Sequence, residues 1–215
     1  MKVAYVFSAT GEDYIRMMRY SEHCLRKFVP DAEVFEIDET IIRKFYNGGD
    51  VTYYTHLAIP LDERFVDYDK VLFLDADCEV VNEKFATIFA FGDRYEITGR
   101  PCSRFVNPKC GPWEVNTDRP QLNGGCVLYN TALINREEWA EKMRGLSEFC
   151  EHNTIASHDE GWMYFMSEPC TIPNLYNNEG HGESYMVHHR HDKKVYIARA
   201  RAFEEGYNCG SEEAK

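Results

Sequence analysis

The sequence of 215 residues lacks the short signals that identify several common classes of protein. Its 8 cysteines include no Cys-x-x-Cys pair, which argues against a zinc ribbon and a thiol redox motif. No Asn-x-Ser/Thr glycosylation site occurs, and no apolar run approaches the length of a membrane span or a signal-peptide core. We therefore expect reduced thiols, no membrane span and a cytoplasmic location.

Positive charge is scarce as well. The sequence has 24 Lys and Arg against 36 Asp and Glu, which gives a formal net charge of −12. Such a chain has no general attraction to nucleic acid or to anionic lipid, so we expect neither as a partner. If the substrate carries phosphates, a metal ion or a local group of basic side chains must receive them.

Two nucleotide-binding signatures are also missing. The first predicted strand, 2–7, is followed by a loop of small residues and a helix, an opening that is common in nucleotide-binding α/β proteins. The loop has neither Gly-x-Gly-x-x-Gly nor a P-loop lysine, which disfavours dinucleotide and P-loop sites. Tyr14 on the helix could still stack on a base, although core packing is the commoner role of a single tyrosine.

What the sequence does contain is a regular alternation of strands and helices. Apolar runs predict strands over 2–7, 33–37 and 70–74, separated by a helix that contains Tyr14 and by one over 52–65, which Pro60 must end or kink. This order predicts an α/β fold with a mostly parallel central sheet, right-handed crossovers and both faces covered. Further strands are expected over 96–99, 122–130 and 185–187, and further helices over 85–89, 135–148 and 161–165. The segment 101–120 is expected to be a long loop, either a functional lid or a disordered excursion.

An acidic pair ends the third predicted strand, in the sequence KVLFLDADCEVV. Asp75 and Asp77 would lie at the carboxyl end of a buried strand, where open α/β sheets hold their ligands. Two carboxylates with one residue between them can both reach a hard divalent cation. The pair therefore indicates a site for a metal and a diphosphate, or else a simple acidic turn.

Three later segments could contribute to the same ligand site. Asn123-Gly124-Gly125 enters an apolar strand, where glycines indicate a backbone close to a ligand, or a bulge. Asp159 and Glu160 precede an apolar helix, either as its N-cap or as carboxylates aimed into a cleft. The run from His188 to Lys194 is the one concentrated basic segment; it could complete a metal site and bind a diphosphate, or form a solvated turn.

In this collinear order the motifs resemble the GT-A-fold glycosyltransferases of family 8, the glycogenin and bacterial lipopolysaccharide galactosyltransferase type. The resemblance covers most of the chain, so we expect one domain over 1–215. Because the chain is short for this family, a module cut from a longer multidomain protein, such as a viral one, would look the same.

The resemblance implies a role for each motif. It implies that Asp75-Ala76-Asp77 binds Mn²⁺ (or Mg²⁺) and through it the diphosphate of a UDP-sugar, with His188 as third metal ligand and Lys194 on a phosphate. The remaining implied contacts are to the uracil by Ala9, Thr10 and Tyr14, to the donor sugar by Asn123, Gly124 and Gly125, and to the reacting sugar by Asp159 and Glu160.

The sequence departs from the family pattern at several positions. His56 stands where the family has Arg or Lys in the helix before the metal strand, His191 replaces a glycine of the last motif, and Val195-Tyr196 replace Pro-Trp. These changes leave open the choice of His188 over His189 or His191 as ligand. They also leave open whether Lys193 or Lys194 contacts the phosphate.

The resulting hypothesis is metal-dependent transfer of a hexose-type sugar from a UDP-sugar to a hydroxyl of a glycan or glycoprotein, with retention as the resemblance implies. Asp159 would stabilise positive charge or position the acceptor; if the reaction inverts, Asp159 or Glu160 would be the base. The alternatives are a metal-dependent phosphohydrolase or nucleotidyltransferase, and a non-catalytic nucleotide-sugar binding module. Donor sugar, acceptor, linkage and oligomeric state are not determined by the sequence.

Overall fold

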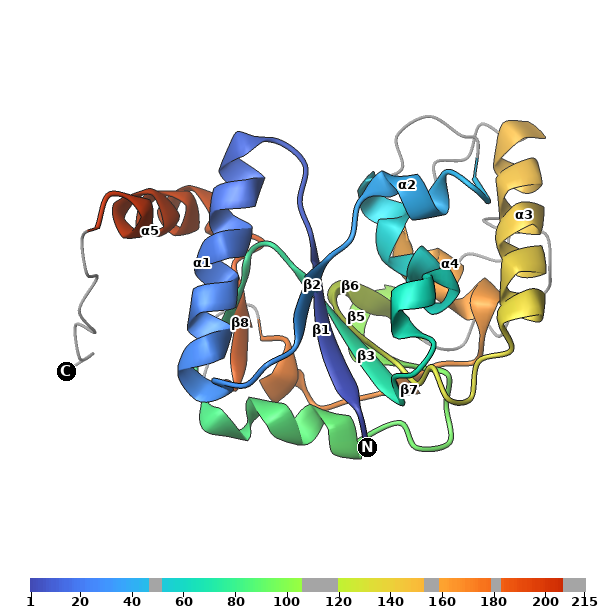
Figure 1. The fold of residues 1–215 in the computed structure, drawn as a ribbon, viewed down its shortest axis with the longest axis horizontal. Helices are drawn as coiled ribbons and strands as arrows, with labels where there is room; N and C mark the ends of the chain where they lie inside the picture. Colours follow the sequence, from blue (N-terminus) through green and yellow to red (C-terminus); the bar gives the residue numbers. More distant parts are fainter. Residues whose placement is uncertain (47–51, 106–119, 153–158, 179–182, 207–215) are drawn as a thin grey trace.

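A computed structural model describes residues 1–46, 52–105, 120–152, 159–178 and 183–206, which form one central sheet with helices on either side (Figure 1). The six strands lie in the order β2-β1-β3-β6-β5-β7. Only β6 runs antiparallel to its neighbours, so the predicted mostly parallel sheet is confirmed. The strands are β1 (Val3–Ser8), β2 (Val34–Glu36), β3 (Lys70–Asp75), β5 (Ile97–Phe105), β6 (Pro120–Tyr129) and β7 (Cys170–Thr171).

A second, two-stranded sheet stands beside the first. Strand β4 (Cys78–Val80) follows the acidic pair almost at once and pairs antiparallel with β8 (Met186–His188). Cys78 is the register partner of His188. This pairing joins the end of the third predicted strand to the basic run far along the chain.

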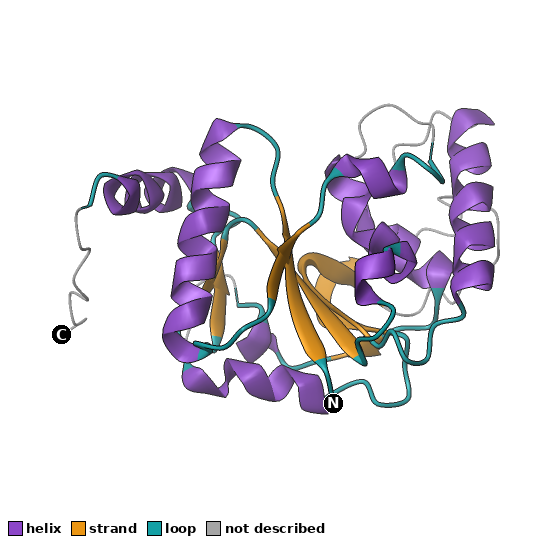
Figure 2. Cartoon of the chain, in the orientation of Figure 1, coloured by secondary structure: helices purple, strands orange, loops and turns teal. Residues whose placement is uncertain are grey.

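Helices cover both faces of the central sheet, as predicted (Figure 2). One face is covered by α1 (Glu12–Phe28) and the 3₁₀ helix η3 (Glu83–Ala90), and α5 (Lys193–Glu204) packs on α1. The other face is covered by α2 (Glu39–Ile42), α3 (Arg136–His152), α4 (Asp159–Met166) and the 3₁₀ helices η1 (Thr52–Leu61) and η2 (Glu63–Phe65), while a short 3₁₀ helix, η5 (Asn174–Tyr176), follows β7.

The alternation of side chains along β1 explains why two helical layers are needed. Ala4 and Val6 belong to the apolar cluster beneath α3 and α4, whereas Tyr5 and Phe7 belong to the one beneath α1. All four side chains are buried. A strand that is apolar on both faces must be covered on both, which is the reason for its continuous hydrophobic run.

Two sequence expectations need correction. The helix predicted over 52–65 is present as two 3₁₀ helices, and Pro60 lies inside η1 instead of ending it. Both ends of the expected loop over 101–120 are strand, because β5 continues to Phe105 and pairs with β6 from Pro120 onward. The part of that loop between them, 106–119, lies outside the described residues.

Two general expectations concern membranes and thiols. No helix in the described part of the chain is both long and apolar enough to cross a membrane. The cysteines whose side chains are described are free thiols, namely Cys24, Cys78, Cys102, Cys126 and Cys170. The expected cytoplasmic location stays a prediction.

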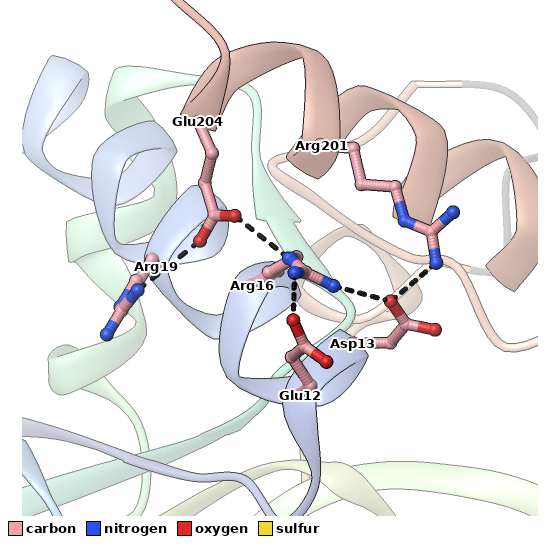
Figure 3. A network of polar contacts seen from close by, with 6 residues as sticks. All are labelled: Glu12, Asp13, Arg16, Arg19, Arg201 and Glu204. Atoms are coloured by element: carbon pink, nitrogen blue, oxygen red, sulfur yellow. Dashed lines mark hydrogen bonds and ion pairs between the residues drawn. The ribbon is translucent and has the colours of Figure 1, made fainter.

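A network of exposed ion pairs joins α5 to the start of α1 (Figure 3). Arg16 lies at its centre, with Nε 2.9 Å from Glu204 and Nη1 3.2 Å from Asp13, and it also pairs with Glu12. Arg201 reaches Asp13 from α5 at 2.8 Å. The network links the end of α5 to the start of α1, and the first residue of α5 belongs to the site described next.

Candidate functional site

The site is built where β3 ends and the chain turns into β4. Asp75 is the last residue of β3 and is the register partner of Ser8 at the end of β1. The loop that follows β1, with half-buried Ala9 and exposed Thr10, therefore leaves from the same edge of the sheet. The Asp75 side chain is 42% exposed, whereas that of Asp77 is only 3% exposed.

His188, at the end of β8, faces both carboxylates. Its Nε2 lies 3.2 Å from Oδ1 of Asp77 and 3.6 Å from Oδ2 of Asp75. Burial would raise the pKa of Asp77, but the contact with His188 and the charges of His188 and Lys193 outweigh it and lower the pKa to about 2. Burial would likewise lower the pKa of His188, but the two carboxylates raise it above its usual value.

The side chains of Asp75, Asp77 and His188 together can bind a divalent cation. A deprotonated Nε2 and two ionised carboxylates would repel one another at these distances unless a positive charge lies between them. Either a proton on His188 or a metal ion can supply that charge. Oxygen and imidazole ligands in this combination fit Mn²⁺, so the residues present fit the metal that the sequence implies. The buried Nδ1 of His188 has no hydrogen-bond partner within the described residues.

Cys78 lies close enough to be considered as a ligand, because its Sγ falls within 4.8 Å of ligand atoms of Asp77 and His188. Its thiol, however, donates to the carbonyl oxygen of Gly125 at 3.1 Å. Burial and the charges of Asp77 and Asp75 raise the pKa of Cys78 well above its usual value. Because a thiol binds metal as thiolate, the carboxylate of Asp75 is the better third ligand.

The Asn-Gly-Gly segment forms a bulge beside His188. Gly99 of β5 pairs with Val127 of β6, and Pro101 pairs with Leu122. The two pairs are therefore two residues apart on β5 but five residues apart on β6. The extra residues are Asn123, Gly124 and Gly125, all buried. A Cβ on Gly125 would lie 2.6 Å from Nδ1 of His188, so only glycine fits there. The bulge interpretation of the glycines is thus confirmed. The group that lies close to Gly125 is the His188 ring, and the contact of this segment with a ligand stays a prediction.

Lys193 contacts the acidic pair, and the ring of Tyr14 lies next to Lys193. The ammonium of Lys193, the first residue of α5, is 3.2 Å from Oδ2 of Asp77. The same Nζ lies 5.2 Å from the centroid of the Tyr14 ring on α1. Tyr14 is 43% exposed, so it is not the core residue that a single tyrosine most often is.

Comparisons with known proteins bear on the fold. No protein-family model and no curated protein matches the sequence. The galactosyltransferase LgtC, solved with donor and acceptor sugar analogues, matches the structure with a TM-score of 0.62 and 14% identity, over 92% of this chain and 95% of LgtC. A glycosyltransferase involved in glycosylation of the major capsid of PBCV-1 matches with a TM-score of 0.60 and 11% identity, over 94% of this chain and 99% of that one. The bifunctional glycosyltransferase WbbM matches with 0.61 and 15% over 96% of this chain, which spans only 51% of WbbM.

The chain has the GT-A fold. Within this GT-A framework, the acidic pair at the end of β3 and the histidine at the end of β8 come together as the sequence comparison of motifs implied. Identity this low fixes the fold only, so the roles of the side chains remain predictions.

The neighbours of His188 lie in different surroundings in this GT-A structure. The Nε2 of His189 is 2.8 Å from Glu79, and its ring stacks on Tyr196 with 4.4 Å between centroids. His191 and Lys194 are both exposed. The geometry therefore favours His188 as the metal ligand and Lys193, rather than Lys194, as the cation nearest to Asp77.

Buried hydrogen bonds that the sequence did not reveal hold the backbone of the acidic pair in place. The hydroxyl of Ser21 on α1 donates to the carbonyl oxygen of Ala76 at 2.6 Å and lies 2.8 Å from the Tyr196 hydroxyl on α5. The backbone N–H of His189 donates to the carbonyl oxygen of Asp77 at 2.9 Å. A small polar residue on the apolar face of α1 was the one signal that could have identified Ser21.

Asn177 is the other residue that sequence reasoning missed. Its Nδ2 donates to Oδ1 of Asn123 at 2.8 Å, and the N–H of Gly125 donates to the same oxygen at 3.0 Å. These two bonds fix the Asn123 side chain inside the bulge. Nothing in the local sequence around Asn177 indicated this contact.

Several of the predicted residues are not brought into this cluster by the contacts described above: Lys194, Ala9 and Thr10 make none of them, and the same holds for His56, Asp159 and Glu160. His56 is buried in the core, with Nδ1 2.6 Å from the Tyr129 hydroxyl and its ring stacked on Phe73. Asp159 and Glu160 form the start of α4, but their side chains lie outside what the structure describes. Their predicted place beside the reacting sugar stays a prediction.

Proposed function

We propose that this protein is a glycosyltransferase that moves a hexose-type sugar from a UDP-sugar to a hydroxyl of a glycan or glycoprotein, with Mn²⁺ (or Mg²⁺) bound by Asp75, Asp77 and His188. The observation that carries the proposal is the meeting of these three side chains, from two distant segments, at the ligand-binding edge of a GT-A sheet.

When bound, the metal would neutralise the negative charge that develops on the leaving diphosphate. The protein's own part is to present ligands and a second cation. The pKa of Asp77 is lowered to about 2, the side chain of Asp75 is 42% exposed, and His188 must release its proton to serve as a ligand. Lys193 supplies a further positive charge within reach of the same diphosphate.

The rest of the donor fits around this centre. The exposed ring of Tyr14 offers a surface on which the uracil can stack, and Ala9 and Thr10, in the loop between β1 and α1, would make the other base contacts. At the other end, both fixed contacts of Asn123 are made to its Oδ1, so its amide nitrogen is the group left to donate to a donor-sugar hydroxyl.

Transfer with retention, as the family resemblance implies, would use Asp159 near the anomeric carbon to stabilise positive charge or to position the acceptor. Transfer with inversion would instead use Asp159 or Glu160 as the base that takes the proton of the acceptor hydroxyl. Determining the anomeric configuration of the product separates these roles.

A thermal-shift panel of nucleotide sugars, each with and without Mn²⁺, tests the proposal. A ligand that binds the native state raises the melting temperature, and we expect this only for UDP-sugars and only with the metal. Stabilisation by no nucleotide sugar, or by several without metal, would contradict the proposal.

Activity assays distinguish the competing functions. A glycosyltransferase releases UDP faster when a suitable acceptor is present, whereas a phosphohydrolase or nucleotidyltransferase cleaves its substrate without one. A binding module would have no activity to lose in the Asp159→Asn and Glu160→Gln variants. Acceptor-dependent UDP release that both substitutions reduce would exclude these alternatives.

A further inference from the structure

Lys193 occupies a position that conflicts with a metal ion at the same carboxylate. Asp77 is nearly fully buried, and each of its oxygens faces one basic group: Oδ1 faces His188 and Oδ2 faces Lys193, both at 3.2 Å. A buried carboxylate needs such compensation. A divalent cation bound to Asp77 would supply it instead, and would repel an ammonium that stayed in place.

The side chain of Lys193 is able to move away from Asp77. Its side chain is 40% exposed, and it starts a helix rather than lying within one. Lysine carries its charge on a flexible stem of four carbons, so the ammonium can move by several ångströms without moving the backbone. The helix behind it stays in place, because Tyr196 and Ala200 of α5 are buried in the same apolar cluster as the inner side of α1, while the ion pairs of Arg16 and Arg201 join the two helices at the surface (Figure 3).

The neighbourhood also indicates where the ammonium would go. It already lies 5.2 Å from the centre of the Tyr14 ring as well as 3.2 Å from Oδ2 of Asp77. In the proposed function, the base lies at Tyr14 and the metal at Asp77, so the diphosphate passes between them. An ammonium leaving Asp77 would meet phosphate oxygens without crossing the site.

We propose that Lys193 is a built-in counter-ion of Asp77, which pairs with this carboxylate in the metal-free protein and exchanges it for the donor's diphosphate when the metal binds. This inference rests on the proposed function for the identity of the donor, but its metal half stands on Asp77 and Lys193 alone. Its consequence is thermodynamic coupling: the metal frees Lys193 for UDP, and UDP, by holding Lys193 away, favours the metal to the same extent.

Calorimetry on three proteins tests this exchange: the wild type, Lys193→Met and Lys194→Met. Methionine keeps the length of the apolar stem and removes the charge. Lys194 is the matched control, because it is the adjacent lysine of the same helix and is exposed. Each protein is titrated with MnCl₂ alone, with UDP alone, and with UDP in saturating MnCl₂, after its melting temperature has been compared with that of the wild type.

For Lys193→Met, we expect Mn²⁺ alone to bind about threefold to tenfold more tightly, because the competing ion pair is gone. UDP in the presence of Mn²⁺ should bind about tenfold more weakly, since a charge-assisted contact is lost. The coupling between the two ligands should fall accordingly. Lys194→Met should change each affinity by less than about twofold, as expected for an exposed charge.

Several results would overturn the proposal. These are unchanged or weaker Mn²⁺ binding in Lys193→Met, no Mn²⁺ binding in either the wild type or this variant, or the same gain in Lys194→Met, which would indicate a general effect of net charge. Unchanged UDP affinity would refute the transfer to the diphosphate. If Mn²⁺ behaves as expected but UDP binds to none of the three proteins, the proposed function fails while the competition at Asp77 stands.

Discussion

Two clusters of charge lie at opposite ends of α5, and they differ in burial and in balance. The exposed network has three carboxylates and three guanidinium groups, from Glu12, Asp13, Glu204, Arg16, Arg19 and Arg201, with side chains between 25% and 79% exposed. The site cluster has two carboxylates, one ammonium and an imidazole that is charged only when protonated. Asp77 and His188 in it are at most 5% exposed.

The comparison teaches that balance and burial, rather than the number of ion pairs, indicate function. The network is electrically satisfied and solvated, so each of its contacts adds little. In the site, the two carboxylates are compensated by His188, which is charged only when protonated, and by Lys193, whose ammonium can move away. Burial makes that arrangement costly unless something compensates it, which is what a bound cation does. The following experiments probe this difference.

The largest effect is expected from removing a carboxylate of the site. Asp75→Ala or Asp77→Ala should lower Mn²⁺-dependent UDP affinity by at least about 100-fold, because each removes a direct metal ligand. Calorimetry measures the affinity, and circular dichroism checks that the variant is folded. Asp75→Ala is the cleaner of the two, because that side chain is 42% exposed. Unchanged metal-dependent affinity in a folded variant would contradict the metal site.

The second effect separates two adjacent histidines. His188→Ala should weaken Mn²⁺ binding by about tenfold or more. His189→Ala, which loses Glu79 and the Tyr196 ring, should chiefly lower the melting temperature. The same pair of titrations and melting curves on His191→Ala serves as a control at an exposed position. Equal losses of metal affinity in all three variants would mean that His188 is not the ligand.

The third effect is a dependence on pH that the network should lack. The metal needs neutral His188, whose pKa is raised in the metal-free protein, so Mn²⁺ affinity should fall by about tenfold per pH unit below that pKa. Without metal the sign is opposite: the raised pKa stabilises the folded protein at low pH, and this stability is lost as the pH rises through it. Calorimetry and thermal melts between pH 6 and 8 would measure both trends. If Mn²⁺ affinity and the melting temperature without metal changed with pH in the same direction and to the same extent, His188 would not be the titrating metal ligand.

The fourth effect concerns the support behind the acidic pair. Ser21→Ala leaves the buried carbonyl of Ala76 without its donor, which should cost about 1–2 kcal/mol of unfolding free energy and also weaken Mn²⁺ binding several-fold. Thr131→Val is the matched control, because it removes a similar bond, to the Tyr68 carbonyl, away from the site. Chemical unfolding and Mn²⁺ titration of both variants decide. Loss of metal affinity in Thr131→Val as well would indicate a general loss of stability.

The smallest effect is expected in the exposed network. Glu204→Gln removes the partner that Arg16 and Arg19 share, yet the melting temperature should change by roughly 1 °C or less and by even less in high salt. Mn²⁺ affinity should be unchanged. A drop as large as that of Ser21→Ala, or an effect on metal affinity, would show that the two clusters are linked through α5.

Much of this molecule was determined by local sequence. The continuous apolar runs 2–7 and 70–74 predicted strands buried on both faces, and strand-helix alternation predicted their parallel order, since each pattern reflects only neighbouring residues and their burial. The position of Asp75 at a strand end follows from the same pattern. The family resemblance then implied the partners of the acidic pair, although not which histidine or lysine.

Tertiary structure decided the remainder, because pairing between distant strands is not encoded in local periodicity. Insertion of antiparallel β6 between β3 and β5 brings the Asn123–Gly125 bulge beside Asp75. The register of β4 on β8 selects His188, since successive side chains on a strand point to opposite faces and a shift of one residue would present His189 instead. The docking of α5 on α1 brings Lys193 to Asp77. These choices depend on hydrogen bonds and packing between segments far apart in the chain, which only the folded molecule contains.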